Sequence, residues 1–243
     1  MSHWLVFLIA LLSILPTRAE TVVIGAEDDW YPYSGVLDGK PHGFAEDIVA
    51  AAFQAVGIDV KYESLPYARC MAETRAGKLA GCFDAARNSL LEPHYLWHAQ
   101  PLYVARINIY ARSASPESGL TVKSLEGKRV AVTNNYEYGE AFDTDSQILR
   151  DVSNQDVQGF RKLAAGRVEY MVAYSKVADY LVGRYKAEFL GKFKVVGTTG
   201  APGLYVAFSR AYPGAGQIVD KFNAGLDMIR KDGRYEGIEA RWR

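Results

Sequence analysis

The feature that most constrains the fold is an alternation of predicted strands and helices that runs twice along the chain. The first set begins with a strand at 21–26 and a helix at 44–56, in which apolar residues recur at helical spacing. A linker rich in serine, proline and glycine at 113–119 interrupts the pattern, and a second set begins with a strand at 130–133. Alternating strands and helices favour an α/β fold with mostly parallel sheets. Two such sets on either side of a linker predict two lobes.

The remaining predicted elements complete both sets. Further strands are predicted at 59–64, 80–85, 103–111, 168–173, 193–196 and 204–209. Further helices are predicted at 67–76, 140–150, 157–166, 175–183 and 218–231, with a short terminal helix at 235–242. We expect the strand at 204–209 to lead the chain back, so that the last helices return to the first lobe.

The first nineteen residues predict an export signal. Residues 4–15 are apolar except for Ser13, and this run is too short to cross a bilayer core of about 30 Å as a helix. The small residues Thr17 and Ala19 precede a cleavage position between Ala19 and Glu20. We therefore expect a signal peptide at 1–19 and a periplasmic protein, with a membrane anchor as the alternative. No cysteine lies near this position, so a lipid anchor is not expected.

Charge and composition argue against several classes of function. Lysine and arginine together number 28, as do aspartate and glutamate, and no basic tract is present. This balance argues against a nucleic-acid partner. No Ser-His-Asp order, phosphate loop or metal-ligand spacing is evident, so no cofactor and no metal site are predicted.

The two cysteines, Cys70 and Cys82, predict a disulfide. An even number of cysteines in an exported chain favours pairing. The predicted layout places Cys70 on a helix and Cys82 on the next strand, which pack against each other. A bridge closing a loop of this length would contribute on the order of 3 kcal/mol. Two buried free thiols are the alternative.

A turn before the first helix is the first sign of a known family. Residues 38–44 read DGKPHGF, and in the periplasmic solute-binding proteins that serve polar amino-acid transporters a turn of the type D-G-x-x-x-G-F leads into the first helix. Five further segments follow in the order of that family: AGKL at 76–79, WHAQPLY at 97–103, SLEGKRVAV at 124–132, LAAGRVE at 163–169, and DG at 232–233 with Trp242. The chain therefore resembles periplasmic solute-binding protein family 3, over nearly all of its length after residue 19.

This resemblance implies a type II periplasmic binding fold, with two α/β lobes joined by two hinge strands. Each lobe would hold a mostly parallel sheet flanked by helices. The expected boundaries place 20–110 and 204–243 in lobe 1 and 111–203 in lobe 2. Ligands of open α/β sheets lie beyond the carboxyl ends of the strands, and two hinge strands allow the lobes to close on a ligand.

The resemblance also implies positions that line the cleft. Trp30 and Tyr67 fall where the family has aromatic residues that face the ligand, although Trp30 could simply pack its own loop. Family members that bind α-amino acids pair the α-carboxylate with an arginine, but that position is Glu92 here. We expect Arg87, just past the predicted strand, to take over this role; an ordinary surface arginine is the alternative.

Two further departures concern charge in the cleft. The family's acidic residue for the ligand ammonium group corresponds to Tyr174, and Glu137 in the other loop of lobe 2 could supply the missing negative charge. Arg87 would need either an anionic group of the ligand or a neighbour such as Asp84 or Glu27, because an unpaired buried charge costs several kcal/mol. If a neighbour neutralises Arg87, the pocket favours a neutral or cationic ligand.

Three functions compete at this stage. The first is capture of a small polar, amino-acid-like solute for a membrane permease or a sensor, with a monomer as the family-based expectation. The second is a dehydratase-like enzyme on the same fold, with acid–base candidates Glu27, Asp84, Glu137 and His98. The third is a degenerate module that acts through a protein partner. We favour solute capture, because carboxylates in a binding cleft more often hold ligand charge than transfer protons.

Overall fold

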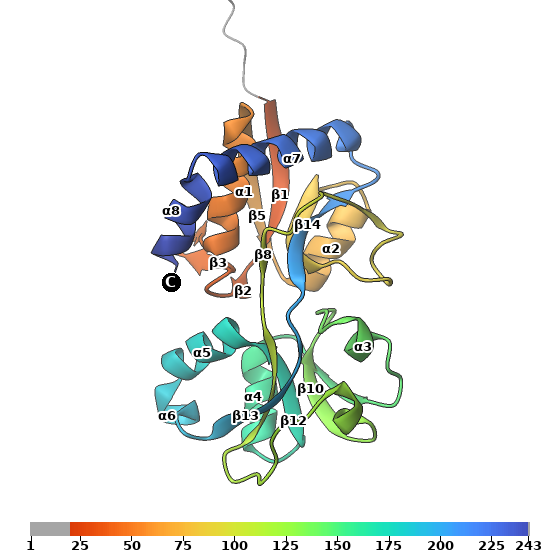
Figure 1. The fold of residues 1–243 in the computed structure, drawn as a ribbon, viewed down its shortest axis with the longest axis vertical. Helices are drawn as coiled ribbons and strands as arrows, with labels where there is room; N and C mark the ends of the chain where they lie inside the picture. The colour runs from red at the N-terminus through yellow and green to blue at the C-terminus, as the bar shows by residue number, and fades with distance from the viewer. Residues whose placement is uncertain (1–19, 243) are drawn as a thin grey trace, which may run out of the picture.

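Two lobes make up the computed structural model of the protein, which describes residues 20–242 (Figure 1). The predicted signal peptide, with its cleavage position after Ala19, lies outside the described residues. Within residues 20–242, no helix combines the length and the apolar character needed to cross a membrane. Strands and helices alternate in both lobes, as the sequence predicts.

A six-stranded sheet forms the first lobe in the order β5-β1-β6-β14-β7, with β8 paired to β14. β1 runs parallel to β5 and β6, and β14 runs antiparallel to β6. A small side sheet of β2, β3 and β4 follows β1. The elements of this lobe are β1 (Glu20–Glu27), β2 (Asp29–Trp30), β3 (Ser34–Leu37), β4 (Lys40–Pro41), α1 (Phe44–Ala55), β5 (Ile58–Leu65), α2 (Tyr67–Arg75), β6 (Gly81–Ala86), β7 (Tyr95–Trp97), β8 (Tyr103–Val104), β14 (Gly203–Ser209), α7 (Ala215–Lys231) and α8 (Arg234–Arg241).

A five-stranded sheet forms the second lobe in the order β11-β10-β12-β9-β13. β10 is parallel to β11 and β12, whereas β9 runs antiparallel to both of its neighbours. The elements of this lobe are β9 (Ile107–Arg112), a 3-10 helix η1 (Val122–Leu125), β10 (Arg129–Thr133), α3 (Glu140–Asp143), β11 (Leu149–Ser153), α4 (Asp156–Ala164), β12 (Tyr170–Tyr174), α5 (Ser175–Arg184), α6 (Lys186–Phe189) and β13 (Phe193–Gly200).

The chain passes between the lobes twice, from β8 to β9 and from β13 to β14 (Figure 1). The single strand predicted at 103–111 is therefore two strands, because its first part pairs in the first sheet and its second part in the second sheet. The expected boundary assigned residues 107–110 to the first lobe, whereas β9 pairs with β12 and β13 of the second.

The helix predicted at 140–150 is wrong over most of its length. Only α3 (residues 140–143) is helical, and β11 begins at Leu149 and pairs in parallel with β10 along its whole length. Residues 144–147 include the turn formers threonine, aspartate and serine, and the Asp145 side chain accepts a hydrogen bond from the Gln147 amide at 2.8 Å. That local hydrogen bond competes with the backbone hydrogen bonds of a helix. The pairing with β10 then holds residues 149–153 in a strand.

Helix α7 returns to the first lobe and packs across α1. Its buried residues Ile218, Phe222, Leu226 and Ile229 recur at helical spacing and form one face. Gly225 allows the close approach, because a Cβ atom at this position would lie 1.9 Å from the Ala52 carbonyl oxygen. The packing of α7 on α1 therefore depends on a residue without a side chain.

The disulfide between Cys70 and Cys82 is confirmed, with its Cα atoms 5.9 Å apart. It joins α2 to β6, as the predicted layout requires. The Tyr95 hydroxyl also donates a hydrogen bond to the Met71 carbonyl at 3.0 Å, so α2 is tied to β7 as well. These links fix the helix that begins at Tyr67, which is one of the predicted cleft residues.

Candidate ligand-binding site

Six of the seven predicted ligand-binding residues surround one small cavity between the lobes. They lie near the carboxyl ends of β1, β5, β6, β10 and β12, as expected for open α/β sheets. Together with Tyr136 they form what we name the carboxylate cage: Glu27, Trp30, Tyr67, Asp84, Tyr136, Glu137 and Tyr174. The cavity they enclose measures about 10 Å³, so these side chains meet across the cleft. A ligand can enter only when the lobes or the side chains move apart.

Glu137 is the main link between the two lobes in the cage. Its carboxylate oxygen Oε2 accepts hydrogen bonds from the Tyr67 hydroxyl at 2.7 Å and from the Ala86 amide at 3.3 Å, both in the first lobe. Its backbone carbonyl accepts a hydrogen bond from the Tyr174 hydroxyl at 2.8 Å. The loop after β10 is thereby held against β12, and its acidic side chain is directed at the first lobe.

Glu27 and Asp84 are held by tyrosine hydroxyl groups. Tyr136 of the second lobe donates to Glu27, and Tyr103 donates to Asp84. Asp84 has a backbone φ of +68°, which is uncommon for a residue other than glycine and marks a local distortion of β6. Its second oxygen, Oδ2, is buried without a hydrogen-bond partner among the described residues. The cage therefore contains an unused acceptor.

Aromatic rings form the walls of the cage. The Trp30 ring packs edge-on against Tyr174 with centroids 4.8 Å apart and against Tyr136 at 6.1 Å. Tyr67 packs edge-on against Tyr136 at 5.4 Å. The indole Nε1 of Trp30 is a second buried polar atom without a partner among residues 20–242. Faces of such rings attract ammonium and guanidinium groups.

The electrostatics of the cage are dominated by buried carboxyl groups. Burial raises the pKa of Asp84 to about 7 and that of Glu137 to about 8, and it raises the pKa of Glu27 well above its usual range. The charged side chains that act on them are themselves acidic, such as Asp143 on Glu137. Among residues 20–242, no lysine, arginine or histidine forms an ion pair or a hydrogen bond with these three carboxyl groups.

Arg87 does not reach the cage, contrary to the expectation from the sequence. Its guanidinium group forms a two-pronged ion pair with Glu92, at 2.5 and 2.7 Å, and its side chain is 39% exposed. β6 ends at Ala86, and the loop that follows turns along the surface, where the Asn88 side chain accepts bonds from the Leu90 and Leu91 amides. Arg87 is thus neutralised by a neighbour, and that neighbour is the residue at the family's arginine position.

The amino terminus of α1 does not offer free donors to an anion. The Phe44 amide donates to the Pro32 carbonyl at 3.0 Å and the Ala45 amide to the Tyr33 carbonyl at 2.9 Å. Gly43 is required by this contact, because a Cβ atom there would lie 2.3 Å from the Tyr33 carbonyl oxygen. The glycine of the DGKPHGF turn therefore positions α1 against the loop that carries Trp30.

The sequence prediction left out Tyr136 of the cage and the nearby buried Glu46, and it named His98 as an acid–base candidate although His98 lies outside the cage. Tyr136 joins the cage, and its signal was the alternation of tyrosine and glutamate at 136–138. Glu46 is buried, and burial together with the nearby charge of Asp84 raises its pKa to about 8. His98 does not contribute to the cage: it is fully buried, and its Nε2 accepts a hydrogen bond from the Val206 amide at 2.9 Å.

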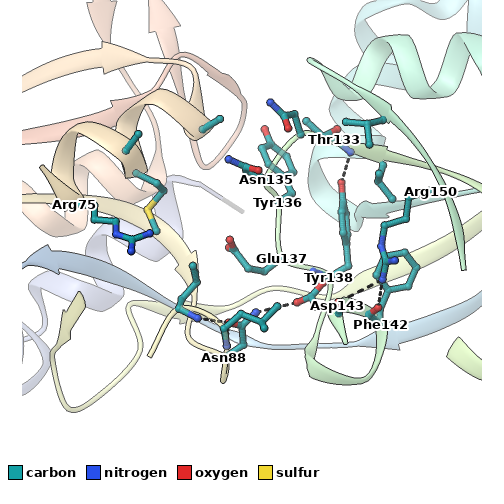
Figure 2. Close-up of a pocket in the computed structure, with 18 of the residues that line it drawn as sticks. Arg75, Asn88, Thr133, Asn135, Tyr136, Glu137, Tyr138, Phe142, Asp143 and Arg150 are labelled. Carbon is teal, nitrogen blue, oxygen red and sulfur yellow. Dashed lines mark hydrogen bonds between the residues drawn. The ribbon is translucent and has the colours of Figure 1, made fainter. Parts of the chain in front are cut away.

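A larger cavity of about 510 Å³ opens beside the cage (Figure 2). We name it the side groove; its walls include Met71, Arg75, Leu91, Tyr95, Glu137 and Phe142. Tyr136 and Glu137 line both the side groove and the cage. Figure 2 shows Glu137 between Arg75 on one wall and Tyr138 on the other. No residue of this groove other than Glu137 was among the predicted site residues.

The fold and the interlobe site define a type II periplasmic binding protein. Residues 22–243 match the family described as bacterial extracellular solute-binding proteins, family 3, and the chain belongs to that family. The family predicted from the sequence motifs is thereby confirmed.

Similar proteins agree with this assignment. The chain is 21% identical to a probable histidine-binding protein of Campylobacter jejuni, over 90% of this chain and 83% of that protein. It is 24% identical to the probable amino-acid-binding protein YxeM of Bacillus subtilis, over 90% and 82%. Among solved structures, a histidine kinase sensor domain with similarity to periplasmic binding proteins superposes with a TM-score of 0.80 at 22% identity, covering 93% of this chain and 96% of that one. An ancestral arginine-binding protein bound to arginine superposes with a TM-score of 0.78 at 21% identity, covering 93% and 98%.

Proposed function

We propose that this protein captures a small organic cation, bearing an ammonium or guanidinium group, in the carboxylate cage and presents it to a membrane permease or a sensor. One observation carries the proposal: Glu27, Asp84 and Glu137 are buried together, and no cationic side chain from residues 20–242 pairs with them. The same proposal places the protein in the periplasm as a monomer after loss of residues 1–19.

The physical reason lies in the cost of buried charge. An ionised carboxylate removed from water is strongly disfavoured unless a positive charge or several hydrogen bonds compensate it. Tyrosine hydroxyl groups provide part of that compensation for Glu27 and Glu137. A ligand cation would provide the rest, and the rings of Trp30 and Tyr67 would add cation–π attraction.

The relatives support the same class of ligand. The names of similar proteins include histidine-binding and arginine-binding proteins. Our chain differs from α-amino-acid binders because Arg87, which could have met an α-carboxylate, is paired with Glu92 outside the cage. The cage therefore favours the cationic end of a ligand over a complete zwitterion.

We propose binding without chemical change of the ligand. A dehydratase-like reaction needs a positioned acid or base that exchanges protons with solvent or substrate. His98 lies outside the cage, and its Nε2 accepts a hydrogen bond from β14. Each of the three buried carboxyl groups accepts a hydrogen bond from a tyrosine hydroxyl group, and Glu137 also accepts one from the Ala86 amide. These contacts support a role in holding ligand charge.

A thermal-shift screen of residues 20–243 tests the proposal. The panel contains butylamine, agmatine, putrescine, arginine, lysine and histidine, with glutamate, glutamine and glucose as comparison. A ligand that binds only the native state raises the melting temperature by mass action, so the cations should raise it and glutamate should not. Asp84→Asn should abolish the shift, because it removes a buried negative charge while keeping a similar shape.

Asp220→Asn is the matched control, because this carboxylate is exposed on α7 and lies outside the cage. It should leave the shifts unchanged. The proposal is wrong if the folded protein responds to glutamate or glucose and to none of the cations. It is also wrong if the cations act equally on Asp84→Asn.

A further inference from the structure

The side groove lies directly beside the cage. Tyr136 and Glu137 are the partition between the two, since each lines both cavities. A molecule whose cationic end occupied the cage would leave it past these two side chains and enter the side groove. The volume of about 510 Å³ is within the range of ligand pockets.

The walls of the side groove come from both lobes, and a disulfide and hydrogen bonds hold them in place. Met71 follows Cys70, so the disulfide to Cys82 fixes that wall, and Tyr95 bonds to the Met71 carbonyl. The Asn88 amide of the first lobe donates to Asp143 of the second at 3.0 Å, and this bond joins the lobes beside the groove (Figure 2). Leu91 and Phe142 add apolar surface.

The charged groups of the side groove are paired within the protein, with one exception. Both oxygens of Asp143 accept hydrogen bonds, from the Tyr138 amide and from Asn88. Arg150 donates to the carbonyl oxygens of Phe142 and Asp145, at 2.5 and 2.9 Å, and lies over the Phe142 ring. Among residues 20–242, no side-chain hydrogen bond or ion pair engages Arg75, which lines the opposite wall.

Arg75 is also placed at a defined distance from the cage. α2 begins at the cage residue Tyr67 and ends at Arg75, and eight residues of helix rise about 12 Å. The positive charge of Arg75 acts on the hydroxyl of Tyr95 in the same groove, where it opposes the effect of burial on the pKa of that tyrosine. A cation therefore lines the side groove about 12 Å along α2 from the cage residue Tyr67.

We propose that the ligand is a linear molecule with a cationic head and a carboxylate tail, longer than a free α-amino acid. The head would occupy the carboxylate cage, the middle would lie along the apolar walls of the side groove, and the carboxylate would pair with Arg75. This inference rests on the proposed function, because the cage must hold the head. It explains how a ligand carboxylate is recognised although Arg87 is occupied by Glu92.

Calorimetry with matched probes tests the inference. Butylamine has only the head, octylamine adds the chain, and 8-aminooctanoate adds the carboxylate. For the unmodified protein we expect 8-aminooctanoate to bind tightest, and Arg75→Gln should weaken its binding by about two- to fivefold while octylamine binding is unaffected. Arg69→Gln is the control, since Arg69 lies on the same helix, pairs with Glu73 and does not line the groove.

A second variant tests the path of the chain. Ala72 is an exposed residue of α2 that lines the side groove, so Ala72→Trp should fill the groove without disturbing the core. We expect the substitution to weaken the binding of octylamine and 8-aminooctanoate and to leave the affinity for butylamine unchanged. Unchanged binding of butylamine also shows that the variant is folded.

The outcomes separate this inference from the proposed function. If all three amines bind with equal affinity, and neither Arg75→Gln nor Ala72→Trp changes it, the side groove is not a ligand subsite, while cation capture by the cage stands. If butylamine and octylamine both fail to bind a folded protein, the cation-binding cage is wrong. Tight binding of 8-aminooctanoate that survives Arg75→Gln would overturn the assignment of Arg75.

Discussion

Among the single residues, Glu137 connects the two lobes and also the two cavities of the cleft. It is bonded to Tyr67 and Ala86 of the other lobe, and it separates the cage from the side groove. Burial raises its pKa to about 8, so its neutral form is the one that the folded protein favours at pH 7. Its protonation state should therefore control both stability and binding.

Glu137→Gln tests the effect on stability. The folded-state pKa of about 8 exceeds the usual 4.5, so the contribution of Glu137 to the free energy of unfolding is fully present below about pH 4.5 and is lost as the pH rises through about 8. Glutamine stays neutral and keeps an oxygen for Tyr67. Relative to the unmodified protein, the variant should gain stability between pH 5 and pH 9, on the order of 4 kcal/mol. Urea denaturation at several pH values measures this gain, and a difference that does not change with pH would contradict it.

Cation binding should release protons. A bound cation stabilises the ionised forms of Asp84 and Glu137, whose pKa values are about 7 and about 8 without it. The affinity for butylamine should therefore rise between pH 5 and pH 8, while the amine itself stays charged. Calorimetry at pH 6.5 in two buffers with different ionisation enthalpies should give different binding enthalpies. Equal enthalpies and a flat pH profile would show that the carboxyl groups do not lose protons.

At the scale of elements, the pairing of α1 with α7 determines how the end of the chain returns to the first lobe. The pairing depends on Gly225, whose backbone lies against the carbonyl of Ala52. α2 is held in a different way, by the Cys70–Cys82 bridge to β6. The cage residues Tyr67 and Asp84 belong to these same two elements, so the disulfide also sets their spacing.

Gly225→Ala should destabilise the first lobe. The added Cβ atom would stand 1.9 Å from the Ala52 carbonyl oxygen, so α7 must shift, and overpacking of this kind costs about 1–3 kcal/mol. Gly216→Ala is the matched control on the same helix, because a Cβ atom at Gly216 meets nothing within 4 Å. That variant should instead be slightly stabilised by the helix propensity of alanine. Urea denaturation compares the two, and equal stabilities would contradict the packing argument.

At the scale of the whole molecule, contacts outside the cage also join the two lobes. The carboxylate of Glu140 in the second lobe accepts hydrogen bonds from the amide and the hydroxyl of Ser89 in the first. Gln155 donates to Asp29 at 2.8 Å, and the rings of Tyr31 and Tyr180 pack at 4.7 Å. These contacts can form only when the lobes are closed, so they add to the stability of the closed arrangement.

Glu140→Ala should shift the molecule toward the open arrangement. Loss of the bonds to Ser89 removes stabilisation from the closed state alone, so the apparent affinity for a cation should fall by a factor of about two to five. The melting temperature without ligand should change little, because Glu140 is exposed. Small-angle scattering should show a larger radius of gyration for the variant. An unchanged affinity and radius would show that this contact does not contribute to closure.

Much of the site could be predicted because the family resemblance assigns Trp30, Tyr67 and Tyr174 to the cleft, and the strand ends at which the site residues lie agree with it. Glu27, Asp84 and Tyr174 lie at or near the carboxyl ends of their strands, and parallel strands present those ends along one edge of a sheet. Tyr136 was missed because its position depends on how the loop after β10 meets Glu27 of the other lobe. Arg87 was misplaced because the surface course of the loop after β6 let Glu92 pair with it.

The sequence by itself determined the α/β class, the two lobes, the disulfide partners and the family, because periodicity, cysteine number and motif order are local properties that survive without coordinates. Tertiary structure decided that residues 149–153 form a strand, because only the pairing with β10 makes that conformation favourable. It also decided the cage and the side groove, because both are built from residues of two lobes. The relative placement of the lobes follows from packing and hydrogen bonds across the cleft, and no local pattern in the chain encodes it.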